Sequence, residues 1–282
     1  MAEHLKILVT GASSGIGRAV AIELAQRGHT VFSAARRRAT LDDLAASHRG
    51  IVAVPLDVTD EDSIDSAWSL ISSATQGAGV DVLVNAAGYA LTGPIETLST
   101  QEVKRQFDTN VFGLLAVTRA VLPSMRARRA GRIVNISSVV GRTSFPAMGV
   151  YGATKHAVEA LSDSLRMELA PTGIKVVLIE PGFVATDIVD ASTRERAEPA
   201  VQPVGDVDGY GSLIEAADRF LAKQMKQAMP ASALARTIAN AAESRRPRNR
   251  YVAPVSAKGL VAVFTRLPDR VADAAKRRAI VG

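Results

Sequence analysis

The sequence predicts a single α/β domain, a doubly wound parallel sheet with helices on both faces. Short apolar runs rich in β-branched residues alternate with amphipathic stretches along the chain as far as Pro181. Strands that alternate with helices in this way form crossovers within a parallel sheet. The chain has 282 residues, of which 47% are hydrophobic, which is enough for one large core. We therefore expect residues 1–282 to form one domain.

Strands are predicted where a short apolar run ends at a turn residue. The first run, Leu5–Val9, stops at Thr10 and Gly11, and the later runs follow the same rule. These runs lie at residues 5–9, 30–35, 51–56, 80–84, 132–136, 175–180 and 251–252.

Helices are predicted where apolar residues recur every three or four positions. The first begins at Ile16 and stops before Gly28, a typical C-terminal residue. The segments are 16–27, 41–46, 60–71, 100–127, 151–168, 213–229 and 231–244. Alternation fades after Pro181, so we expect residues 187–230 to be an insertion that acts as a substrate lid. Residues 245–282 form a basic C-terminal extension, a helix pair broken at Pro268.

The positive net charge of the chain is concentrated in its last fifth. The net charge is +6, but residues 236–282 carry eleven basic and three acidic side chains, so the remainder is slightly acidic. We expect no nucleic-acid partner; the tail is interpreted as a helical segment packed on the body, with membrane-surface contact as the alternative. The absence of cysteine excludes disulfides and thiolate metal sites, no metal is expected, and a cytoplasmic location is expected.

A glycine-rich loop joins the first predicted strand to the first predicted helix. Glycines in this context allow a tight turn, close backbone approach to a pyrophosphate and close helix packing, as in a Rossmann-type fold. The N–H groups at the helix start favour an anion. The candidate phosphate-binding residues are Gly11, Ser13, Ser14, Gly15, Ile16 and Gly17.

The end of the second predicted strand indicates which dinucleotide is bound. An NAD site usually carries an acidic residue there for the ribose 2′-hydroxyl. This sequence has Ala34 and Ala35 instead, followed by Arg36 and Arg37. A guanidinium suits a 2′-phosphate through its charge and its forked donors. The pattern predicts NADP(H), with these arginines as candidate ligands of the 2′-phosphate.

A tyrosine and a lysine on one helix are candidates for proton transfer. Tyr151 and Lys155 are four residues apart and therefore share a helical face. A nearby cation would lower the tyrosine pKa, which is otherwise about 10. Ser138 ends a predicted strand, at the sheet edge where ligands of open α/β folds bind. Asn110 lies inside an otherwise apolar helix.

In this order and spacing, the motifs resemble those of the short-chain dehydrogenase/reductases, specifically the shorter branch that includes NADP-preferring hydroxysteroid dehydrogenases and carbonyl reductases. The resemblance covers most of residues 5–186. It rests on the segments Thr10–Gly17, Asp57–Val58, Asn85–Gly88, Asn110, Ile136–Ser138, Tyr151–Lys155 and Pro181–Thr186.

The resemblance implies a catalytic role for four residues. Tyr151 would be the general acid/base, and Ser138 would hydrogen-bond the substrate oxygen. Lys155 would hold the nicotinamide ribose and tune the tyrosine. Asn110 would hold, through its backbone carbonyl, a water in a proton relay to Lys155.

The resemblance also implies further cofactor contacts. Asp57 and Val58 would flank the adenine. The remaining residues would lie along the cofactor or line the nicotinamide: Asn85, Ala86, Gly88, Pro181, Gly182, Val184 and Thr186. Arg36 matches the position that binds the 2′-phosphate in NADP-dependent members, and Arg37 is a weaker candidate. Some NADP-preferring relatives also carry a base where this chain has Ser14, so the NADP prediction depends on Arg36.

These features predict hydride transfer between NADP(H) and an alcohol or ketone. Two alternatives are a non-enzymatic NADP-binding regulatory protein and an epimerase-type isomerase, whose glycine spacing this loop does not fit. The substrate is expected to be hydrophobic, because the candidate pocket residues are mostly apolar: Tyr89, Leu91, Phe145, Met148, Val150 and Phe183. By resemblance, we expect a homodimer or homotetramer.

Overall fold

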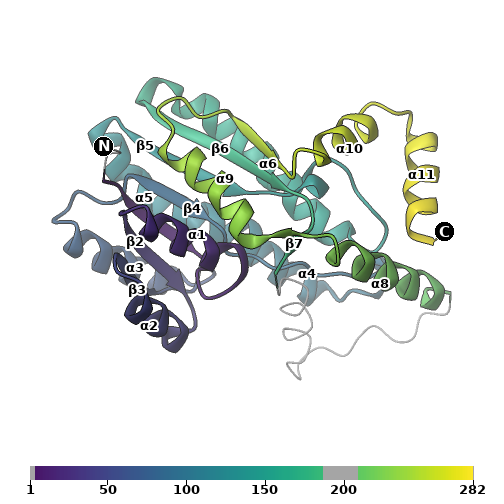
Figure 1. The fold of residues 1–282 in the computed structure, drawn as a ribbon, viewed down its shortest axis with the longest axis horizontal. Helices are drawn as coiled ribbons and strands as arrows, with labels where there is room; N and C mark the ends of the chain where they lie inside the picture. Colours follow the sequence, from purple (N-terminus) through teal and green to yellow (C-terminus); the bar gives the residue numbers. More distant parts are fainter. Residues whose placement is uncertain (1–3, 187–208, 282) are drawn as a thin grey trace.

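A computed structural model describes residues 4–186 and 209–281. Its centre is a seven-stranded sheet with the order β3-β2-β1-β4-β5-β6-β9 (Figure 1). The neighbouring strands all pair in parallel. The strands are β1 (Lys6–Thr10), β2 (Thr30–Ala35), β3 (Ile51–Pro55), β4 (Val82–Asn85), β5 (Gly131–Ile136), β6 (Ile174–Pro181) and β9 (Arg250–Ala253). The predicted doubly wound parallel sheet is confirmed.

Helices cover both faces of the sheet because successive strand residues point to opposite sides. On one face, Ile7 and Val9 belong to a core shared with α1 (Gly15–Gln26), α2 (Arg38–Ser47) and α9 (Ala231–Glu243). On the other face, Leu8 packs in a core with α3 (Glu61–Ala74), α5 (Leu114–Arg128) and the end of α6 (Gly149–Leu169). The two cores hold the sheet in place from both faces, and the candidate site lies at one edge of this sheet.

The segment predicted as one helix over 100–127 is interrupted. It consists of α4 (Thr100–Phe107), a π-helical turn at Asp108–Gly113, and α5. A capping box between Ser99 and Glu102 fixes the start of α4. Periodicity cannot distinguish a π turn from the α-helix around it, and such turns occur frequently at functional sites.

The region after β6 differs from the prediction in one detail. Helix α8 (Gly211–Met225) is shorter than the predicted segment 213–229, because Met229 and Pro230 form strand β8. This strand pairs with β7 (Val184–Ala185) in a small second sheet. The first part of the predicted lid, residues 187–208, lies outside the described residues.

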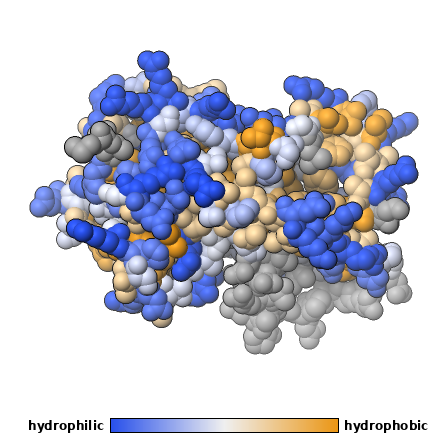
Figure 2. All heavy atoms as spheres, viewed as in Figure 1, coloured by the Kyte–Doolittle hydropathy of each residue, from blue (hydrophilic) through white to orange (hydrophobic). Residues whose placement is uncertain are grey.

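The C-terminal extension forms two helices, α10 (Ala257–Phe264) and α11 (Asp269–Val281). Helix α11 contacts α8 beside the body (Figure 1). Hydrophobic side chains are visible over α10 among the hydrophilic ones of the extension (Figure 2), and Val255, Val263 and Val271 are each more than half exposed. Across the described ranges, every helix is too short or too polar to cross a membrane.

Candidate active site

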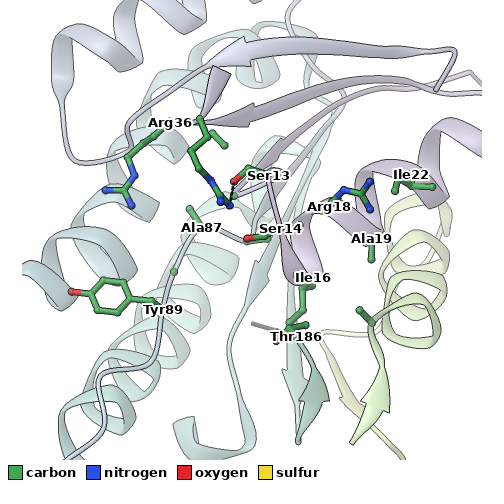
Figure 3. A pocket seen from close by; sticks show the side chains of 18 of the residues that line it. Ser13, Ser14, Ile16, Arg18, Ala19, Ile22, Arg36, Ala87, Tyr89 and Thr186 are labelled. Atoms are coloured by element: carbon green, nitrogen blue, oxygen red, sulfur yellow. Dashed lines mark hydrogen bonds between the residues drawn. The ribbon is translucent and has the colours of Figure 1, made fainter. Parts of the chain in front are cut away.

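A cavity of about 940 Å³ opens at the carboxyl edge of the sheet, around the point where the strand order reverses between β1 and β4 (Figure 3). Open α/β sheets bind ligands in this position. It is lined by these predicted cofactor residues: Gly11, Ser13, Ser14, Gly15, Ile16, Gly17, Arg36, Arg37, Asp57, Val58, Ala86, Gly88 and Thr186. Gly11 and Thr186, which are 175 positions apart in the chain, thus meet in one space because parallel strands share an edge.

The glycine loop has the close contacts that its sequence predicts. Gly11 has φ +68°, and a Cβ atom there would lie 2.8 Å from the Ala87 Cα. A Cβ at Gly17 would collide with the Gly11 carbonyl. Helix α1 begins at Gly15, has no acidic residue in its first turn, and receives no side-chain cap. Its first N–H groups are therefore available to an anionic group, so the loop fits a pyrophosphate.

Two arginines follow β2 at the rim of the cavity. The Arg37 Nη2 atom donates a hydrogen bond to the Ser13 hydroxyl at 3.1 Å, and so connects this rim to the glycine loop. Arg36 and Ser13 lie on the same part of the cavity wall in Figure 3. Sequence reasoning ranked Arg37 second, whereas the structure puts its guanidinium directly on the loop. Arg18 also lines the cavity and was not foreseen.

The residues predicted at the adenine end are held by local contacts. The Asp57 carboxylate accepts from the Thr59 backbone N–H at 3.0 Å and from its hydroxyl at 2.7 Å. Val58 packs against Gly113, where a Cβ would lie 2.7 Å from the valine Cγ2. Both residues form a wall of the cavity. A side chain at position 113 would push Val58 toward the cofactor space.

Six predicted cofactor residues do not line the cavity: Asn85, Tyr151, Lys155, Pro181, Gly182 and Val184. Asn85 has a structural role instead. Its buried amide donates to the Thr118 hydroxyl at 3.1 Å and to Asn135 Oδ1 at 2.9 Å. Asn135 in turn donates to Ser162 at 2.9 Å. The chain of hydrogen bonds runs from α5 across β4 and β5 to α6. The Asn85 side chain therefore stabilises the sheet beneath the site.

The segment after β6 contributes in two ways. The Thr186 side chain lines the cavity, and a Cβ at Gly15 would lie 3.4 Å from it. Val184 is buried in the core beneath. The Pro181 carbonyl accepts a hydrogen bond from the Ser138 hydroxyl at 3.2 Å, and the Gly182 N–H donates to Ala253 at 2.8 Å. Pro181 thus lies beside the predicted catalytic serine.

Ser138 and Tyr151 come together at the end of β5 and the start of α6. The Ser138 hydroxyl interacts with the phenol and accepts from the Val140 N–H at 3.3 Å. Both side chains are nearly buried. Burial raises the pKa of Tyr151 to about 12, and Ser138 partly offsets this shift. The phenol is therefore protonated at neutral pH.

Lys155 lies one turn after Tyr151, with its Nζ 5.6 Å from the tyrosine ring centroid. The same Nζ donates to the Ile136 carbonyl at 2.9 Å. Burial lowers the pKa of Lys155 to about 8. In the polypeptide by itself the Tyr151 pKa is thus raised, and not lowered as expected from a nearby cation, because desolvation of the buried phenol is the largest influence on it.

Asn110 lies in the π-helical turn and is fully buried. Its side chain bonds both backbone groups of Tyr89, at 3.1 and 3.0 Å, and donates to Thr154 at 3.1 Å. A Cβ at Gly88 would lie 2.9 Å from Asn110 Oδ1 and 3.9 Å from the Lys155 Nζ. The structure thus brings all four predicted catalytic residues to one place.

A helix of the basic extension packs beside Tyr151, a contact that sequence reasoning missed. Val261 of α10 is buried in a cluster with Tyr151 and Val140, and Phe145 and Met148 pack against the cluster. Phe264 contacts Phe145 edge to face, with ring centroids 6.0 Å apart. The sequence offered no signal for this contact beyond the apolar residues of the extension.

Four of the six predicted pocket residues lie away from this cluster. Tyr89, Leu91 and Val150 are buried with Leu98 in a separate core. They support the loop after β4 instead of facing the phenol. Phe183 contacts Phe220 of α8, with ring centroids 6.1 Å apart. Phe145 and Met148 are placed beside Tyr151 as expected, and Tyr89 lines the cofactor cavity.

Comparison with known proteins agrees with this geometry. The family model for short chain dehydrogenase matches residues 5–197. An NADPH-dependent 3-dehydrocapnine reductase of Ornithobacterium rhinotracheale is 33% identical over 94% of each chain. A solved short-chain dehydrogenase of Streptomyces avermitilis has a TM-score of 0.81 and 35% identity, over 99% of this chain and 96% of that one. A Burkholderia phymatum short chain dehydrogenase/reductase in complex with NAD has a TM-score of 0.81 and 28% identity over 93% of each chain. The chain belongs to the short-chain dehydrogenase/reductase family and is an oxidoreductase that transfers hydride.

Proposed function

We propose that this enzyme uses NADP(H) to interconvert an apolar ketone and its alcohol, with Tyr151 as the proton donor in reduction. The observation that carries this proposal is the convergence of Asn110, Ser138, Tyr151 and Lys155. They meet the cofactor cavity at Gly88 and Tyr89, which line it and contact Asn110. Each of the four comes from a different part of the chain or a different helical turn, and their side chains are all nearly buried.

The preference for NADP(H) rests on charge at the end of β2. That strand ends in Ala34 and Ala35, and two guanidinium groups follow it at the cavity rim. Arg37 is already oriented by the Ser13 hydroxyl at 3.1 Å. A forked cation suits a phosphate, whereas a 2′-hydroxyl is better bound by a carboxylate. The NADPH-dependent relative supports this preference. Because a similar structure was solved in complex with NAD, the preference between the two cofactors has to be measured.

When bound, the nicotinamide supplies the hydride. The protein supplies position and a proton. Tyr151, protonated at neutral pH, donates its proton to the carbonyl oxygen, and Ser138 donates a hydrogen bond to the same oxygen after leaving Pro181. Lys155 holds the ribose hydroxyls and favours the phenolate left behind. Asn110 fixes the loop at Tyr89, and its carbonyl belongs to the proposed path of proton return.

An apolar substrate fits the groups around the phenol. Val139, Val140 and Val261 are buried with Tyr151, and Phe145 and Met148 border the same cluster. Burial of apolar ligand surface against such side chains contributes about 25 cal/mol per Å². We place the alkyl or ring part of the substrate between α10 and the loop before α6.

We also propose a homodimer or homotetramer. Phe112, in the π-helical turn before α5, is 58% exposed, and Met167, on α6, is 68% exposed. Large apolar side chains that are this exposed are typical of contact surfaces. Sedimentation of the purified chain measures the oligomeric state directly.

The test is a panel of ketones assayed with NADPH and NADH in parallel, using the wild type and Tyr151→Phe. Phenylalanine keeps the ring and removes the acidic proton. We expect reduction of apolar ketones by the wild type, with NADPH preferred, and a loss of at least about a hundredfold in kcat for the variant. Turnover near the wild-type rate in the variant would refute the assignment of Tyr151.

A further inference from the structure

We infer that Glu159, a buried carboxylate on α6, is a positioning residue that keeps the Lys155 ammonium protonated, and that Arg250 of β9 holds this carboxylate in place. The inference rests on the proposed function, because it concerns the lysine assigned to the cofactor ribose. It concerns a residue that the family motifs of this sequence do not contain.

Lys155 and Glu159 are neighbours on one face of α6, since four residues separate them. Each is 6% exposed. A buried ammonium needs a compensating negative group. Within residues 4–186 and 209–281, no carboxylate lies within 4.0 Å of the Lys155 Nζ, and its described hydrogen bond goes to the Ile136 carbonyl. Glu159 is the acid that opposes its desolvation: burial lowers the Lys155 pKa, and Glu159 raises it.

One side of the Glu159 carboxylate is fixed by Arg250. The Arg250 Nε and Nη2 atoms both donate to Oε2 at 3.2 Å. The other oxygen, Oε1, is buried, and neither it nor the Ser137 hydroxyl forms a hydrogen bond of standard length and angle among the described residues, although that hydroxyl lies close enough to Glu159 to lower its pKa. Burial raises the Glu159 pKa, while Ser137 and Arg250 lower it. The carboxylate is therefore anchored, yet its charge is not fully satisfied by hydrogen bonds.

Arg250 and Glu159 belong to a charge network in which the other two acids, Asp163 and Glu180, each contact a second arginine. Arg250 also contacts Asp163 at 2.6 Å and Glu180 at 3.0 Å. The remaining contacts are Arg142 with Glu180 at 3.4 Å and Arg166 with Asp163 at 2.9 Å. Glu180, on β6, raises the Glu159 pKa, and Asp163 lies one turn farther along α6 from Lys155. Among these acids, Glu159 is the one that lies a single helical turn from Lys155 on the same helix.

This arrangement predicts a pH effect with a definite sign. With Glu159 ionised, Lys155 keeps its proton to higher pH. Without that charge, Lys155 loses its proton at lower pH, and the alkaline limb of ketone reduction moves down with it. An opposite charge within about 4–6 Å shifts a pKa by about 1–3 units, and residues four apart on a helix have Cβ atoms about 5–6 Å apart. We expect a shift of about one unit, and hence about a tenfold lower kcat/KM at pH values above both limbs.

The direct experiment is NMR of ¹³C-labelled lysine in the protein alone, with the Lys155 resonance assigned by its loss in Lys155→Met. Glu159→Gln removes the charge and keeps the shape, so we expect the Lys155 titration to fall by about one unit. Asp163→Asn is the matched control. It removes another carboxylate bound to Arg250, but one that is 37% exposed and a turn farther away. We expect the control to leave the titration in place.

The pH profile of kcat/KM for ketone reduction is the second readout, and a merely structural role of Glu159 would not move its limb. Should Glu159→Gln not fold, the double change Glu159→Met with Arg250→Met removes both charges together, which buried pairs often tolerate. In this double variant Glu180 still pairs with Arg142, and Asp163 still pairs with Arg166. The same downward shift is expected.

A Lys155 titration within about 0.3 unit of the wild type in a folded variant would overturn the inference, as would an equal shift in Asp163→Asn. The NMR readout requires no turnover. Its failure is therefore distinct from failure of the proposed function, which would appear as a wild type that reduces no ketone.

Discussion

Replacing Gly11 with alanine should damage the cofactor loop while the rest of the sheet folds. The residue has φ +68°, in the left-handed region where an L side chain costs about 1–2 kcal/mol. Its new Cβ would lie 2.8 Å from the Ala87 Cα and 2.9 Å from the Ala86 carbonyl oxygen. Both neighbours are backbone atoms, so no side-chain rotation can relieve the contact. Overpacking of this kind costs about 1–3 kcal/mol in addition.

Gly28→Ala is the matched control. Gly28 also has a positive φ, +89°, but a Cβ there meets nothing within 4 Å. It follows α1, precedes the amino end of β2, and is not among the residues that line the cavity. This change should therefore lose only the conformational part, about 1–2 kcal/mol. The difference between the two variants isolates the crowding at the loop.

The assay combines urea unfolding with calorimetric titration of NADPH. We expect Gly11→Ala to lower the free energy of unfolding by about 2–5 kcal/mol and to weaken NADPH binding at least about tenfold. Gly28→Ala should bind NADPH as the wild type does. The reasoning is refuted if Gly11→Ala unfolds with the same free energy as Gly28→Ala and binds NADPH normally, because the backbone contact would then cost nothing.

Three further predictions follow from named contacts. The double variant Arg36→Ala with Arg37→Ala should weaken NADPH binding about tenfold or more and leave NADH binding nearly unchanged; equal loss of both in calorimetry would remove the 2′-phosphate assignment. Lys155→Met should abolish turnover and raise the free energy of unfolding at pH 7 by about 1–3 kcal/mol. Burial lowers the lysine pKa from 10.5 to about 8, so the lysine charge destabilises the fold below pH 8. The stability gain of the variant should shrink between pH 8 and 10.5; a gain that grows over this range in urea unfolding experiments would contradict the prediction. Val261→Ala should lower kcat/KM for apolar ketones about fivefold with no change in the NADPH dissociation constant, a split that parallel kinetics and calorimetry measure.

The sequence predicted best where a motif is local and its backbone is regular. Tyr151 and Lys155 share a helical face because of their spacing alone, and the glycine loop is fixed by the strand before it and the helix after it. Parallel pairing then brings the ends of β1 and β4 together. These steps require only periodicity and steric rules, so the sheet, the cavity edge and the catalytic helix could be predicted.

Prediction failed where partners are far apart or where burial decides the chemistry. Asn85 belongs to a motif but satisfies a buried hydrogen-bond chain with Thr118 and Asn135, which no spacing rule reveals. The pairing of Glu159 with Arg250 spans 91 positions. The phenol pKa could not be predicted, because the sequence shows the cation beside Tyr151 but not the desolvation around it.

The basic extension was interpreted from its composition as a helical segment packed on the body, but its place at the site was not predicted. Its apolar residue Val261 is buried in one cluster with Tyr151. That packing contributes to the burial that raises the phenol pKa to about 12. Movement of α10 away from the cluster would readmit water to the phenol, and its pKa would fall toward the value of about 10 found in water. The extension therefore bears on the chemistry by controlling how dry the proton donor is, independently of the charges that it carries.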